Sequence, residues 1–115
     1  MKLEFSENQI SWDLDGGIFS IGVENIEQAI FSKSQNVIAA LIQENKSSKK
    51  IVILETSGEI RHEIEQPKNH HFNYLGSNRG YDLAIMSKVN ITGWRDWWFS
   101  INAKKGVLEN LGDGR

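Results

Sequence analysis

The fold of this chain is decided by the stretch VILETSGEIRHEI, residues 52–64. It consists of an apolar run, a polar turn closed by Gly58, and a second run in which apolar and charged residues alternate. Alternation with a period of two is typical of a half-buried strand, and Ser-Gly is a turn pair that supplies a residue able to take a positive φ. The stretch therefore predicts a β-hairpin, with His62 and Ile64 on one face and acidic residues on the other.

The same pattern of strand, turn and strand occurs twice more in the chain. Residues 10–21 read ISWDLDGGIFSI and residues 98–111 read WFSINAKKGVLENL. The glycines that we expect to close the three turns, Gly17, Gly58 and Gly106, are 41 and 48 residues apart. A repeat of this length indicates a recurring structural unit rather than three unrelated hairpins.

The segments that precede the second and third hairpins also match each other. Residues 30–41 and 74–85 each contain a short strand, a polar turn and a longer apolar strand. The unit is then four strands in about 45 residues, which resembles a β-propeller blade. The sequence therefore predicts an all-β fold of antiparallel sheets in a single domain, 1–115, made of an N-terminal hairpin, 1–25, and two four-stranded blade-like repeats, 26–65 and 70–111.

The arrangement of these units follows from their number. Two and a half blades are too few to close a ring, which takes at least about four blades. We expect an incomplete propeller-like or a sandwich arrangement, or an oligomer that completes the ring. Residues 24–46 would also suit one or two short helices, because their apolar spacing and Ala39-Ala40 allow it, but the repeat favours strands.

Composition excludes several classes of chemistry. The absence of cysteine removes disulfides, thiol catalysis and thiolate metal sites, and it suits a reducing cytoplasm. The longest apolar run, 37–42, is too short to cross a membrane, and the N-terminus lacks the apolar core of a signal peptide, so we expect a cytoplasmic protein with no membrane partner. Phosphate-binding loops, dinucleotide fingerprints and nucleophile elbows do not occur, so we expect no enzyme, no cofactor and no metal. The enzymatic alternative is an RNase-like use of His70, His71 and Tyr74.

Charge and aromatic residues indicate where a partner would bind. Residues 1–65 hold 11 acidic and 6 basic residues, a net charge of −5, whereas residues 66–115 hold 4 acidic and 7 basic residues, a net charge of +3. The acidic half suits a basic protein partner, and the acidity of the chain argues against direct binding of nucleic acid. Three of the four tryptophans lie between Gly93 and Ser100. Alternation places Trp97 and Trp98 on opposite faces, so at least one of them belongs to the core.

A small chain with no cysteine, no catalytic signature and an acidic half resembles the immunity proteins of bacterial polymorphic-toxin and contact-dependent growth-inhibition systems. The resemblance implies a non-enzymatic protein that neutralises a cognate toxin, such as a basic nuclease, by occluding its active site. Carboxylates would pair with lysines and arginines of the toxin around an aromatic anchor. The candidate partner-binding residues are Asp13, Asp15, Glu55, Glu59, Glu63, Glu65, Trp94 and Trp98. The alternatives are a carbohydrate- or small-ligand-binding module that uses the cluster 94–99, and a propeller-like oligomerising scaffold.

Overall fold

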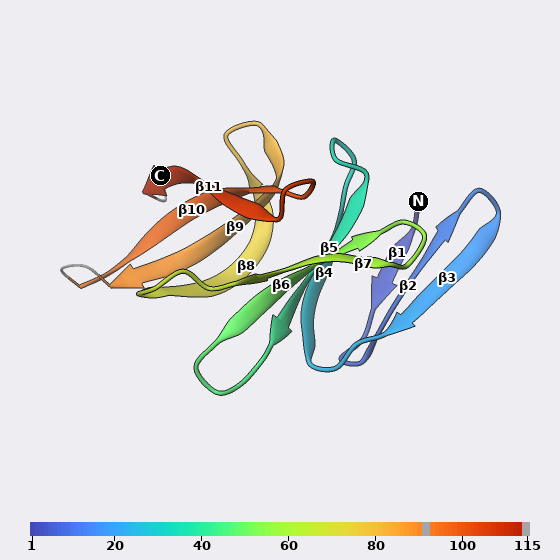
Figure 1. The fold of residues 1–115 in the computed structure, drawn as a ribbon, viewed down its shortest axis with the longest axis horizontal. Coiled ribbons are helices and arrows are strands. Elements are labelled where there is room, and N and C mark those ends of the chain that lie inside the picture. The colour runs from blue at the N-terminus through green and yellow to red at the C-terminus, as the bar shows by residue number, and fades with distance from the viewer. Residues whose placement is uncertain (91–92, 114–115) are drawn as a thin grey trace.

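The computed structural model describes residues 1–90 and 93–113, and their regular structure consists of antiparallel β-strands (Figure 1). The first sheet has the order β1-β2-β3, the second β4-β5-β6-β7 and the third β11-β10-β9-β8. The strands are β1 (Leu3–Phe5), β2 (Gln9–Leu14), β3 (Gly17–Gly22), β4 (Ile26–Ser32), β5 (Val37–Gln43), β6 (Lys49–Glu55), β7 (Ile60–Glu65), β8 (His70–Asn78), β9 (Tyr81–Asn90), β10 (Trp94–Asn102) and β11 (Val107–Asp113). The predicted all-β fold with two four-stranded repeats is confirmed, and residues 24–46 form strands rather than helices.

The second sheet lies between the other two, so both of its faces are buried. The sheets follow one another in chain order from the first sheet, blue in Figure 1, to the third, which runs from yellow to red. Alternate residues of β5, beginning with Val37, enter the core against the third sheet, and the residues between them, beginning with Ile38, enter the core against the first sheet. This explains why β5 and β6 are continuous apolar runs, because a strand that is covered on both faces has no polar side.

The turn between β2 and β3 differs from the expectation. The sequence pattern predicts Gly17 as its closing glycine, which is wrong, because Gly17 is the first residue of β3. The two-residue turn is Asp15-Gly16, with φ of 50° and 80°. Positive φ at both positions defines the hairpin turn whose twist matches that of the strands, and Asp-Gly is a favoured pair for it. The other two predicted glycines, Gly58 and Gly106, do take a positive φ.

Side-chain amides join the second sheet to the third through the backbone. Gln28 on β4 donates from Nε2 to the carbonyl oxygen of Leu75 at 2.8 Å and accepts from the Leu75 N–H at 2.7 Å. Gln35, in the turn after β4, donates to the carbonyl of Ile101 and accepts from the N–H of Ala103, both at 2.7 Å. Each amide satisfies one backbone donor and one backbone acceptor of the third sheet, as a paired strand would.

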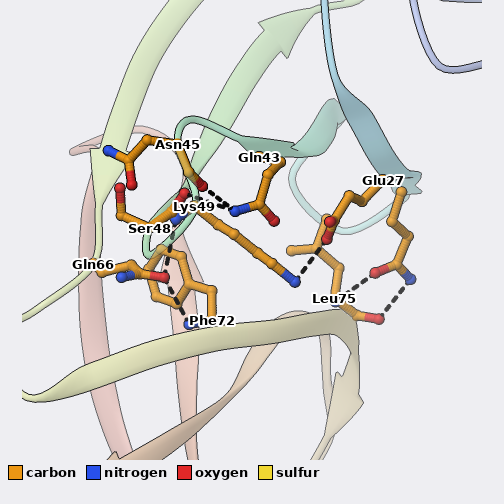
Figure 2. A network of polar contacts seen from close by, with 9 residues as sticks. Glu27, Gln43, Asn45, Ser48, Lys49, Gln66, Phe72 and Leu75 are labelled. Carbon is orange, nitrogen blue, oxygen red and sulfur yellow. Dashed lines mark hydrogen bonds and ion pairs between the residues drawn. The ribbon is translucent and has the colours of Figure 1, made fainter.

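A second set of polar contacts lies where the β5–β6 hairpin meets the start of β8 (Figure 2). The Gln66 side-chain oxygen accepts from the backbone N–H groups of Lys49 and Phe72, both at 3.0 Å. The Lys49 ammonium pairs with Glu27 on β4 at 2.7 Å. These contacts fix the hairpin and the connection from β7 to β8 relative to each other.

Asp82, at the start of β9, holds the turn between β4 and β5. Its Oδ1 accepts from the hydroxyls of Ser32 at 2.8 Å and Ser34 at 2.6 Å, and its Oδ2 accepts from the Ser34 N–H at 2.9 Å. Burial raises the pKa of this carboxyl, but the hydrogen bonds from Ser34 and Ser32 lower it more, so that the pKa of Asp82 lies below its ordinary value. The ionised carboxylate therefore links the two four-stranded sheets.

Candidate partner-binding site

The most exposed aromatic side chain of the described residues is Trp94, the first residue of β10, which is 63% exposed. It lies directly after Gly93, whose φ is 107°, and pairs with Asn90 at the end of β9. A surface groove of about 460 Å³ opens beside it, where the β5–β6 hairpin, the start of β8, the end of β9 and the start of β10 meet. The groove is lined by Ser47, Asn69, His70, His71, Lys88 and Trp94. Trp94, predicted as an anchor, is therefore available to a partner.

One wall of the groove is rigid because His70 is held on two sides. The Nδ1 atom of His70 lies 2.9 Å from the Ser87 hydroxyl, and its ring meets the ring of Phe99 edge-on at 5.0 Å. Burial lowers the pKa of His70, so the imidazole is neutral at neutral pH. His70 thus supplies a fixed, uncharged surface to the groove.

The groove is also lined by a residue of an ion pair between neighbouring strands. Lys88 on β9 and Asp96 on β10 are register partners, and the Lys88 ammonium pairs with the Asp96 carboxylate. His71 is the register partner of Lys88 on the other side, on β8. The groove therefore combines an exposed indole, two imidazoles and a neutralised lysine, a mixed surface that can contact both apolar and polar groups of a ligand.

Trp98 and Trp97, next to the groove on the same strand, have structural contacts. Trp98 is 7% exposed, and it meets Tyr74 edge-on at 5.7 Å and packs with Ala84 and Met86. Trp97 packs against the core between the second and third sheets and donates from Nε1 to the side-chain oxygen of Asn110 at 2.7 Å. Trp98, the other predicted anchor, therefore offers little surface to a partner in this conformation.

Two of the acidic candidates are paired within the chain. Glu55 lies 2.6 Å from the Arg61 guanidinium, and Glu63 lies 2.6 Å from the Lys50 ammonium. The hydrogen bond with Glu63 raises the pKa of Lys50. A basic partner would have to compete with these cations for both carboxylates.

Glu65, at the end of β7, is the register partner of Lys50 and so shares this cation with Glu63. Burial raises the pKa of its carboxyl, and a hydrogen bond with Glu44 raises it further. Two carboxyls that share a hydrogen bond ionise less readily than isolated ones, because the second charge is placed beside the first. Lys50 already offsets part of this repulsion, and a cation from a partner would offset more of it.

The remaining acidic candidates, Asp13, Asp15 and Glu59, are exposed. Asp13 accepts a hydrogen bond from the backbone N–H of Lys2 at 2.6 Å, and Asp15 and Glu59 lie in turns. The Trp12 indole donates to a carbonyl in the β6–β7 turn, which carries Glu59. The structure thus divides the predicted site into an acidic region on the first and second sheets and an aromatic groove on the third.

Three residues that line the groove, Ser47, Asn69 and Lys88, are not predicted from the sequence as site residues. Ser47 lies in the β5–β6 turn, Asn69 in the connection from β7 to β8, and Lys88 near the end of β9. Only the packing of the β5–β6 hairpin against the third sheet brings them together. The feature of the sequence that could have pointed to these residues is the four-strand repeat, because it places strand ends at the same edge of neighbouring sheets.

Comparisons with known proteins add no relative. The chain matches no protein-family model, and neither a curated protein nor a solved structure is significantly similar to it. Within residues 1–90 and 93–113, no group of three His, Asp or Glu side chains is placed to hold a metal ion. In the same residues, no helix is long and apolar enough to cross a membrane.

Proposed function

We propose that this chain is a non-enzymatic protein-binding domain, and that it serves as a bacterial immunity protein that binds a cognate toxin in the cytoplasm and occludes its active site. The observation that carries the proposal is Trp94, which is 63% exposed beside the groove of about 460 Å³. Exposed tryptophan is unfavourable in water and is enriched among the residues that dominate binding energy at protein interfaces.

The distribution of charge supports a basic partner. Asp15 and Glu59 are exposed and have no ion-pair partner among the residues that the structure describes, so their carboxylates can pair with lysine or arginine of another protein. Glu65, beside Glu44, would gain from the approach of a cation because the repulsion between the two carboxyls would fall. The assignment to immunity proteins as a class rests on the size of the chain, this charge and the lack of a catalytic signature.

The proposal is tested with the gene that lies beside the gene for this chain. We expect it to encode a large toxin whose C-terminal fragment co-purifies with this protein and loses its toxicity in the complex. Trp94→Ala should weaken binding at least about 30-fold, the effect of removing an interface anchor worth about 2 kcal/mol or more. The control is Tyr81→Ala, which removes an aromatic that is 49% exposed in the β8–β9 hairpin and should change affinity less than about threefold.

Two results would overturn the proposal. One is that no neighbouring gene encodes a toxin that binds this chain. The other is equal affinity of the Trp94→Ala and Tyr81→Ala variants for the toxin fragment, which would remove the groove from the interface. A change in tryptophan fluorescence with members of a glycan panel, abolished by Trp94→Ala, would instead support the carbohydrate-binding alternative.

A further inference from the structure

The outer edge of the first sheet has a composition that edge strands usually avoid. β3 reads Gly-Ile-Phe-Ser-Ile-Gly and, in the described chain, pairs only with β2. It contains no charged residue and no proline, and its pairing with β2 shows no bulge. An edge strand of this kind presents unpaired N–H and C=O groups without any feature that blocks the approach of another strand.

The other edge strands of the three sheets each have such a feature. β7 carries Arg61, Glu63 and Glu65, and β11 carries Glu109 and Asp113. β4 and β8 contain register shifts in their pairing, and β1 is only three residues long. Protection is therefore present at five edges and missing at β3.

The register of the β2–β3 hairpin shows which groups are open. Leu14 and Gly17 flank the two-residue turn and are paired, so they form the hydrogen-bonded pair next to the turn. Hydrogen bonding alternates along an antiparallel pair, so the N–H and C=O groups of Ile18, Ser20 and Gly22 point away from β2. Ile18, Ser20 and Gly22 are exposed, and Ile18 is 85% exposed.

We infer that β3 is a dimerisation edge, which pairs antiparallel with β3 of a second copy about a two-fold axis. The second copy is favoured as the occupant because each copy offers the same three open residues, and a strand that pairs antiparallel with itself satisfies both edges at once. Pairing brings no charged side chains of β3 together, since the strand has none. The two three-stranded sheets would become one sheet of six strands.

The inference does not involve the groove beside Trp94, although Asp15, an acidic partner-binding candidate, lies in the β2–β3 turn. β3 is in the first sheet and Trp94 is in the third, with the second sheet between them (Figure 1). Pairing of two six-residue strands buries less area than the about 1,200 Å² of a standard stable interface, so the dimer should dissociate on dilution.

The experiment measures the mass of the full chain by sedimentation equilibrium from about 10 μM to about 1 mM, the range in which small interfaces dissociate. We expect the average mass to rise from 13.1 kDa toward twice that value. Ser20→Pro should raise the dimer dissociation constant roughly 10- to 30-fold, because each copy loses one outward N–H that donates across the interface. Ile18→Lys should act in the same direction by placing a charge on the edge.

The matched control is Val107→Lys, which adds the same charge on the β11 edge and should leave the dimer unchanged. Circular dichroism of each variant confirms that the monomer is folded, and Ile18→Lys preserves the test if Ser20→Pro disrupts the hairpin. Hydrogen exchange adds a residue-level readout, since the Ile18 and Ser20 amides should exchange more slowly as concentration rises. A mass of 13.1 kDa at every concentration, or dimerisation of both β3 variants equal to that of Val107→Lys, would overturn the inference.

Discussion

Replacement of Gly106 by alanine tests how closely the second and third sheets are fitted together. Gly106 ends the turn between β10 and β11 with φ of 71°, and a Cβ there would lie 2.5 Å from both Cγ and Nδ1 of His62. The His62 ring cannot easily move away, because its Nε2 lies 3.0 Å from the carbonyl oxygen of Lys104 in the same turn. Gly106 is thus required both for its backbone conformation and for the space that it leaves.

Two terms set the size of the effect of Gly106→Ala. A residue with a Cβ in the left-handed region costs about 1–2 kcal/mol, and overpacking of a fitted contact costs about 1–3 kcal/mol. Gly106→Ala should therefore lower the free energy of unfolding by about 2–5 kcal/mol. Gly80→Ala is the control, because Gly80 has φ of 85° but no atom within 4 Å of its added Cβ, so only the first term applies.

The assay is urea unfolding followed by tryptophan fluorescence for Gly106→Ala, Gly80→Ala, His62→Ala and the double variant at Gly106 and His62. Truncation of His62 removes the steric conflict, so the double variant should be more stable than the sum of the single effects predicts, by about 1–3 kcal/mol. Equal destabilisation by Gly106→Ala and Gly80→Ala would refute the role of the His62 contact. Additive effects of the two substitutions would refute it as well.

Further substitutions probe other contacts. Gln28→Glu should destabilise by about 2–4 kcal/mol at neutral pH, because the carboxylate cannot donate to the β8 carbonyl, and urea titration in acid should show partial recovery as the carboxyl regains a proton. The folded-state pKa of Asp82 is lowered, so the contribution of this carboxylate to stability is complete above the unfolded value of 3.8 and is lost as pH falls through the folded pKa. Asp82→Asn should therefore flatten the acid part of the curve of unfolding free energy against pH. An unchanged curve would contradict this role of Asp82. Trp12→Phe should lower the melting temperature, because it removes the 2.9 Å bond to Thr56 and part of a buried side chain, whereas Trp94→Phe at an exposed site should leave the melting temperature nearly unchanged.

The strand repeat could be predicted because it depends on local patterns. Alternation in residues 52–64 and the polar turns fix where strands begin and end, and the four-strand repeat follows from their order. The wrong prediction of Gly17 in place of Gly16 as the glycine of the first turn also has a local cause. Asp-Gly-Gly offers two glycines, and only the pairing of Leu14 with Gly17 decides which of them lies in the turn.

The site was less predictable because it depends on contacts between distant strands. Alternation places Trp97 and Trp98 on opposite faces, but it does not tell how far each face is covered. Trp98 lies on the face that points away from the second sheet and is nevertheless buried, because Tyr74 on β8 packs against it across the sheet. The register shift between Phe72 and Tyr74 helps to set that position, and such irregularities leave no simple trace in a sequence.

The order of the sheets limits where this protein can meet a partner. The faces of the second sheet are covered by its neighbours, so a partner must use the outer sheets, the exposed turns or the strand edges. The start of β8, which carries His70 and His71, is held to the β5–β6 hairpin by Gln66, so this part of the groove is fixed before a partner arrives. A pre-organised surface loses little conformational freedom on binding, so the loss of affinity in Trp94→Ala should report the lost contact itself. Gln28 does not line the groove. If Gln28→Glu weakens binding of the toxin fragment, the fixed position of the third sheet contributes to the affinity for that fragment.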